Sequence, residues 1–297
     1  MRGKGDSPKL RGVYEKGCSC SLQWIVEVRE RLWFLACFYV IERASRFITL
    51  PVNMAENSIT CVYNNVPGNT GADVRVGAGF SAFIAFKQRN ILFDVGADAT
   101  ILLKNILALG IDARRLDAVV ISHNHWDHVY GLPGIYALEE SDPDVYVAAS
   151  SRGAILEQNP RSKVVPIDEP RQIFPCIWST GSMRVEYRDL SFSEQALILD
   201  NDDGIYVVTG CAHPGIVNIV ERAKQLLPEK SIAMVAGGFH LVSATEQEIM
   251  DISAKLKKLG VKKIAPSHCT GQTAMQIFEE EWGEHYVRLY LGDGYRF

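Results

Sequence analysis

Histidine and carboxylate side chains are concentrated at one point of the chain, where residues 119–128 read VVISHNHWDH. In an extended chain, residues i and i+2 project to the same side, so His123 and His125 can converge on one ion. If the chain then turns, Asp127 and His128 can face an adjacent position. Imidazole and carboxylate groups are suitable ligands for zinc, iron or manganese. Since this run contains no cysteine, a closed structural zinc site is not expected, and a site of histidines and an acid leaves room for a solvent ligand. The segment therefore predicts a catalytic metal site; the alternative is an exposed polar loop.

Strands and helices of an α/β domain must position these side chains. We expect strands at residues 81–86, 90–95, 118–121, 145–149, 183–187, 196–200 and 205–209, and later at 231–236, 262–265 and 286–291. Helical periodicity begins near residue 98 and returns at 215–227, 245–259 and 270–282, with a capping box at Thr245 and Glu248. This order suggests two sheets packed face to face with helices outside, a four-layer αββα sandwich, although composition alone does not choose it over other α/β arrangements.

Composition restricts the class of partner. The 297 residues are 47% hydrophobic and 22% charged, with a formal net charge of −4, so disorder and a polyanion-binding surface are not expected. We therefore expect no nucleic-acid partner. No run reaches the roughly 18 apolar residues of a membrane-spanning helix, so we expect no stable membrane insertion. The seven irregularly spaced cysteines are interpreted as reduced thiols, which predicts a cytoplasmic protein.

The first part of the chain differs from the rest. Residues 1–53 are expected to be an N-terminal extension that is either disordered or not native, and residues 54–297 the functional domain. The apolar run Leu32–Ile41 follows basic residues, but it is too short to span a bilayer. We interpret it as a short amphipathic helix or a loosely attached segment, and Met54 is an alternative start.

Four motifs resemble those of one enzyme superfamily. The sequence HNHWDH resembles the HxHxDH motif of the metallo-β-lactamase superfamily, whose fold is the αββα sandwich, and the resemblance runs from about Ile59 to the C-terminus. Asp94 matches the aspartate that lies under the metal site and orients a ligand. His213, in TGCAH, and His268, in PSHCT, match the later motifs.

The resemblance implies two divalent metal ions. Zinc is favoured, with manganese, iron or magnesium as alternatives. One ion would be held by His123, His125 and His213, and the second by Asp127, His128 and His268.

Besides these four motifs, the superfamily has a further one, and here the sequence departs from its pattern. Many relatives carry an aspartate that bridges both ions, whereas residues 237–241 here read GGFHL. Either solvent alone bridges the ions, or His240 contacts a metal or a substrate oxyanion. We therefore expect a catalytic role for His240, with a merely structural histidine as the alternative. Asp127 is expected to orient the attacking water or to shuttle its proton.

The surrounding residues look like one branch of the superfamily, which contains the dihydropterin–ribofuranosylaminobenzene 5'-phosphate synthases and related metal-dependent hydrolases. We therefore expect a hydrolase that acts through a metal-activated water on a small, anionic, phosphate-bearing or ester substrate. The alternative is a transferase that joins a dihydropterin-methyl diphosphate to an aminobenzene ribofuranosyl phosphate and releases diphosphate. A non-catalytic metal-binding module is the alternative of another class. The oligomeric state is left open.

Overall fold

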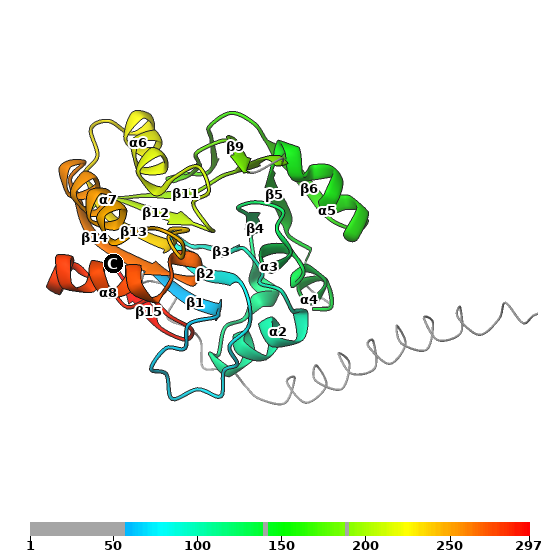
Figure 1. The fold of residues 1–297 in the computed structure, drawn as a ribbon. Helices are drawn as coiled ribbons and strands as arrows, with labels where there is room; N and C mark the ends of the chain where they lie inside the picture. Colours follow the sequence, from blue (N-terminus) through cyan, green and yellow to red (C-terminus); the bar gives the residue numbers. More distant parts are fainter. Residues whose placement is uncertain (1–56, 139–141, 188–189) are drawn as a thin grey trace, which may run out of the picture. The chain divides into compact units, whose positions relative to one another are not determined.

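Two β-sheets form the centre of the protein (Figure 1). The computed structural model describes residues 57–138, 142–187 and 190–297. Within these residues the first sheet has the strand order β15-β1-β2-β3-β4-β5-β6, and β3 to β6 run parallel. Its strands are β1 (Ser58–Asn64), β2 (Phe80–Phe86), β3 (Arg89–Phe93), β4 (Ala118–Ile121), β5 (Asp144–Ala148), β6 (Lys163–Ile167) and β15 (Gly294–Arg296).

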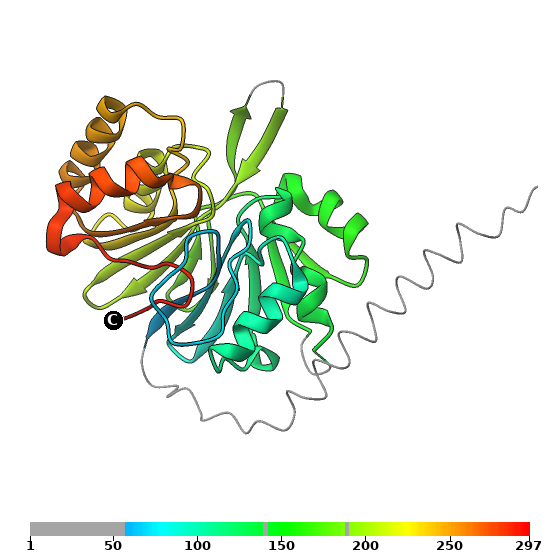
Figure 2. The same cartoon turned by 60° about the horizontal axis from the view of Figure 1, so that its bottom comes forward.

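The second sheet has the order β14-β13-β12-β11-β8-β7, and β12, β13 and β14 run parallel. A separate hairpin of β9 and β10 projects from the sandwich (light green in Figure 2). These strands are β7 (Arg171–Phe174), β8 (Ile177–Ser179), β9 (Met183–Tyr187), β10 (Leu190–Glu194), β11 (Leu197–Asn201), β12 (Gly204–Thr209), β13 (Ile232–Gly238) and β14 (Val261–Ser267).

Helices cover the outer face of each sheet (Figure 1). The α-helices beside the first sheet are α2 (Ala99–Ala108), α3 (Trp126–Val129), α4 (Leu132–Tyr136) and α5 (Arg152–Gln158). Those beside the second are α6 (Ile216–Leu226), α7 (Glu246–Lys258) and α8 (Gln272–Trp282). Short 3-10 helices are η1 (Ala113–Arg115), η2 (Ala149–Ser151), η3 (His268–Thr270) and η4 (Gly283–His285).

Three apolar clusters separate the four layers. One lies between the sheets and includes Phe93 of β3 and Tyr206 of β12. The second joins the second sheet to α6, α7 and α8, and the third joins the first sheet to its own helices. Both faces of each sheet are covered, so a parallel strand in the middle of a sheet must be apolar on both sides. β4 shows this, because all four of its residues are apolar and buried. The predicted four-layer αββα sandwich is confirmed.

Two helices begin at residues whose side chains cap the backbone. Asp98 accepts hydrogen bonds from the first amides of α2, and Thr245 and Glu248 form the predicted capping box of α7. The predicted strand at 286–291 is wrong. That segment makes isolated bridges to two different neighbours, Ile264↔Tyr286 and Pro67↔Leu291, so it forms a ladder with neither.

No helix among the described residues has the length and apolar character that crossing a membrane requires. The described residues belong to one compact unit, Ile48–Phe297. The apolar run at 32–41 and the expected domain boundary at 53/54 lie outside the described residues.

Candidate metal centre

The candidate ligands lie in the loops and short helices that follow parallel strands of both sheets. In the first sheet, Asp94 follows β3 and His123 follows β4. In the second sheet, His213, His240 and His268 follow β12, β13 and β14. Open α/β sheets bind their ligands beyond the carboxyl ends of parallel strands. Here two such edges meet, which brings ligand-type residues from distant parts of the chain together.

The first set of side chains is His123, His125 and His213. One nitrogen of each lies within 4.8 Å of the other two. His123 Nε2 is 3.0 Å from His125 Nδ1, close to the separation of about 3.3 Å expected for two nitrogens on a tetrahedral zinc ion. The ring of Phe192 from β10 lies against this set, 4.9 Å from the His125 ring centroid.

The second set is Asp127, His128 and His268, whose ligand atoms also lie within 4.8 Å of one another. Asp127 Oδ2 is 3.5 Å from His268 Nε2 and 3.8 Å from His128 Nε2. The turn that separates this set from the first one is the start of α3, because His125 is its N-cap and Asp127 lies in its first turn. The structure therefore brings all six predicted ligands together in the two predicted groups, and their binding of metal stays a prediction.

Asp94 orients the ligands that come from the first sheet. Its carboxylate accepts hydrogen bonds from His128 Nδ1 at 2.7 Å and from the Ser122 hydroxyl at 2.8 Å. The same hydroxyl oxygen lies 2.8 Å from His123 Nδ1 and accepts from it, since its own proton goes to Asp94. With their Nδ1 atoms held in this way, His123 and His128 present Nε2 to the centre, the arrangement of metal-binding histidines.

Two residues that sequence reasoning missed orient the remaining histidines. Glu194, at the end of β10, accepts from His213 Nδ1 at 2.8 Å and from the backbone amides of residues 211, 212 and 213. Asn65, after β1, places Oδ1 2.7 Å from His268 Nδ1. The only sequence feature that could have indicated a role for Glu194 is its position as a carboxylate at the end of a strand. No feature of the sequence near Asn65 indicates that it contacts a histidine.

The surroundings of the histidines shift their pKa values in two directions. Burial lowers the pKa of His123 and His268 well below the usual value, and the neighbouring histidines lower it further. Neutral imidazole is the form that binds metal. For His128, burial acts in the same direction, but the Asp94 carboxylate outweighs it and raises the pKa to about 9. The surroundings of His128 thus favour positive charge, which a metal ion would supply.

Buried polar atoms test whether these residues fit a metal ion. His268 Nε2 is buried and has no hydrogen-bond partner among the described residues, although it points at Asp127 and His128. An unpaired buried nitrogen is costly unless another group uses its lone pair. A divalent cation satisfies it, and the donor set of imidazole and carboxylate matches zinc.

Three further residues with ligand-type side chains lie at the centre. His240 has its ring centroid 4.4 Å from that of His213 and forms a candidate group with His213 and Cys211. Cys269 groups with Cys211 and His268. His240 and His268 both have positive φ, 53° and 52°, a conformation that is uncommon for non-glycine residues and is enriched at functional sites. Neither cysteine was predicted to lie at the centre, because the irregular spacing of the cysteines in the sequence is typical of ordinary reduced thiols.

Comparisons with known proteins agree with this fold. A family model described as the metallo-beta-lactamase superfamily matches residues 74–148. An uncharacterized protein of Methanocaldococcus jannaschii is 32% identical over 227 residues, covering 66% of this chain and 85% of that protein. The chain belongs to the metallo-β-lactamase superfamily, whose fold implies divalent metal binding.

Relatives with named activities are enzymes. The 7,8-dihydropterin-6-methyl-4-(beta-D-ribofuranosyl)-aminobenzene-5'-phosphate synthase of the same organism is 29% identical over 246 residues, covering 69% of this chain and 83% of the synthase. The crystal structure of Tm1679, titled a metal-dependent hydrolase of the beta-lactamase superfamily, superposes with a TM-score of 0.66 at 27% identity. It covers 80% of this chain and 98% of that one.

Proposed function

We propose that the protein is a metal-dependent hydrolase that uses two divalent ions, with zinc favoured, and acts on a small anionic phosphate-bearing or ester substrate. The observation that supports this most strongly is the pairing of two ligand sets, each with its atoms within 4.8 Å and with His123 and His128 in contact at a ring-centroid distance of 4.3 Å. The ions supply Lewis-acid activation of water or of a substrate oxygen.

Asp127 is the proposed proton-handling residue. Its side chain is 21% exposed, whereas those of His123 and His128 are buried. Asp127 therefore contacts the other ligands of the centre and is also accessible to solvent. A carboxylate in this place orients a water molecule or accepts its proton. His240, whose ring centroid lies 4.4 Å from that of His213, is proposed to contact the substrate oxyanion.

A neighbouring pocket supports an anionic substrate. It has a volume of about 330 Å³, and one of its lining residues is Pro214, which follows His213 in the sequence. Arg184 of β9, which pairs with Glu186, and Arg222 of α6 line it together with Glu221, and a guanidinium group is well suited to a phosphate. The pocket therefore provides a place for the part of the substrate that does not react.

The test is turnover by the zinc-loaded full chain on a panel of phosphodiesters, phosphomonoesters and lactones. Hydrolysis is expected with at least one class, and His123→Ala or His213→Ala is expected to abolish it and to lower the bound metal while the fold is retained. Full metal stoichiometry in those variants would refute the ligand assignment. Metal binding without turnover of any of these substrates, and without diphosphate release in the transferase assay described below, would instead favour a non-catalytic binding module.

A second candidate is the transferase reaction, which the 29% identity to the synthase over 83% of its length favours. In this reaction an aminobenzene ribofuranosyl phosphate would displace diphosphate from a dihydropterin-methyl diphosphate. Phe192 could pack against a planar substrate, since it lies at the edge of the first set. Diphosphate release that requires the amine would establish transfer, and release without it would establish hydrolysis.

We also propose that residues 54–297 are the functional domain and that the protein acts in the cytoplasm. Among the described residues, Cys61, Cys176, Cys211 and Cys269 are free thiols, which a reducing compartment favours. A protein starting at Met54 should match the full chain in solubility and activity, and loss of either would refute the proposed boundary.

A further inference from the structure

We propose that the thiolate of Cys211 is a metal ligand that lies between the two cations and bridges them. The inference rests on the two-ion centre proposed above but on no particular substrate. It assigns a metal-binding role to a residue outside the six predicted ligands, and it explains how the centre obtains an anionic bridge without an aspartate at 237–241.

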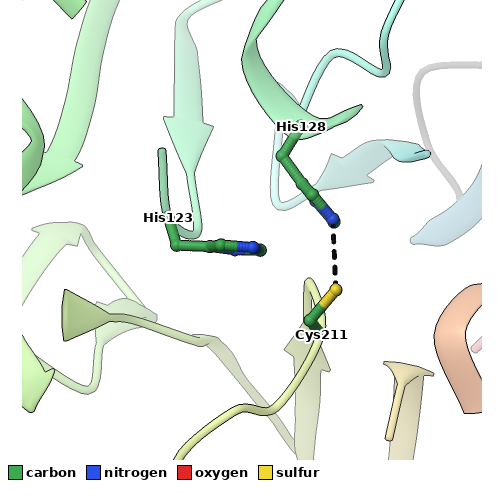
Figure 3. A group of neighbouring side chains, drawn as sticks. All are labelled: His123, His128 and Cys211. Atoms are coloured by element: carbon green, nitrogen blue, oxygen red, sulfur yellow. Dashed lines mark hydrogen bonds between the residues drawn. The ribbon is translucent and has the colours of Figure 1, made fainter. Parts of the chain in front are cut away.

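The position of the Cys211 sulfur atom is the main evidence. It groups with His123 of the first set and His128 of the second, with all ligand atoms within 4.8 Å, and it lies 3.2 Å from His128 Nε2 (Figure 3). It also groups with His213 of the first set and with His268 of the second. One atom that is close to ligands of both sets is in the place of a bridging ligand.

The loop that carries Cys211 is held tightly against the centre. A Cβ on the preceding Gly210 would lie 2.1 Å from Ser122 Oγ and 2.7 Å from Asp94 Oδ2, so only glycine allows this approach. The Cys211 amide donates to Glu194 Oε1 at 2.9 Å, and Cys211 is 4% exposed. The oxygens that orient the histidines therefore also fix the position of the thiol.

The end of β13 has no room for a side chain at Gly238. A Cβ at Gly238 would lie 2.4 Å from the Gly210 oxygen and 2.6 Å from Cys269 Sγ. The loop of Cys211 and the side chain of Cys269 thus occupy the space beside the end of β13. A carboxylate at this position and a close approach of the Cys211 loop exclude each other.

The chemistry of the thiol suits this role. A thiol that binds a divalent ion is deprotonated, and zinc accepts sulfur, nitrogen and oxygen ligands in one site. The six predicted ligands contain a single negative charge, on Asp127, so a thiolate doubles the charge that faces the two cations. Cys269 is less suitable as a bridge, because its sulfur groups with His268 but with no member of the first set.

The test uses the full chain with Cys18, Cys20 and Cys37 replaced by serine, so that thiols outside the described residues make no contribution. The metal-free protein is titrated with Co²⁺, and the sulfur-to-cobalt charge-transfer absorption is recorded. We expect this absorption to grow over two equivalents of Co²⁺, because the thiolate contacts both ions. Protein that binds two equivalents without the absorption would overturn the inference, and protein that binds no Co²⁺ would overturn the two-ion centre itself.

Variants then assign the sulfur. C211S is expected to lose the charge-transfer absorption and to bind Co²⁺ at least about tenfold more weakly. C269S and C61S, the latter in the core between the sheets, are expected to keep the absorption. Absorption that persists in C211S, or that disappears in C269S instead, would overturn the assignment, as would absorption that is complete after one equivalent.

Discussion

Glu194 holds His213 in two ways. Its carboxylate lies 2.8 Å from His213 Nδ1, and it also accepts the backbone amide of His213 at 2.8 Å. Glu194 ends β10, so the projecting hairpin is tied directly to a ligand of the first set. Because the side chain of Glu194 is fully buried, this contact is shielded from solvent and sets the direction in which Nε2 of His213 points.

Replacing Glu194 with glutamine should weaken the first metal site. The amide keeps the shape but cannot accept from all of the donors that surround the carboxylate, so the orientation of His213 is lost. We expect Glu194→Gln to lower the affinity for the first ion by about 10- to 100-fold, measured by titration of metal-free protein. Glu186→Gln, on the exposed part of the same hairpin, is the matched control and should leave the affinity unchanged.

The same carboxylate predicts a pH dependence of stability. Burial alone would raise the pKa of Glu194, but hydrogen bonds from His213 and from nearby backbone amides outweigh it and lower the pKa. A group whose folded-state pKa is lowered contributes stability above its unfolded pKa and loses it as the pH falls through the folded value.

In metal-free protein, the difference in unfolding free energy between the parent and Glu194→Gln should therefore shrink as the pH falls below the usual glutamate range. Urea denaturation at a series of pH values measures it. A difference that stays constant into the acid range would show that the charge of Glu194 does not carry the effect.

Asp94→Asn should weaken the second site. Asn tolerates the positive φ of 56° at this position, so the backbone is kept while the charge beside His128 is removed. We expect the affinity for the second ion to fall by about 10- to 100-fold, and the affinity for the first ion to fall less, because Asp94 reaches His123 only through the Ser122 hydroxyl. Equal losses at both sites would contradict the separate roles given to Asp94 and Glu194. Asp73→Asn, at a side chain that is 87% exposed, is the control.

Gly238→Ala tests the crowding beside β13. The added methyl group would meet the backbone oxygen of Gly210, which cannot move without shifting the Cys211 loop. We expect a loss of about 2 kcal/mol in the free energy of unfolding. Gly153→Ala, where nothing lies within 4 Å of the added atom, should be neutral or stabilising by up to about 1 kcal/mol. Equal stability of the two variants would show that the strand end has room for a side chain.

Much of the fold could be predicted because its signals are local. The capping box at Thr245 and the buried strand before His123 are encoded by neighbouring residues, and both are present in the structure. The segment at 286–291 was misassigned because its apolar alternation serves two cores, with Tyr286 packed in one and Leu289 in the other.

The sequence by itself determined the grouping of His123, His125, Asp127 and His128, because an extended strand end followed by a helix start places these neighbours around one point. Only the tertiary structure decided which groups orient and surround them. Glu194 and His213 are 19 residues apart, Cys211 and His128 are 83 apart, and Asn65 and His268 are 203 apart. These contacts between residues far apart in the sequence form only when the two sheets pack together. No local sequence pattern predicts them.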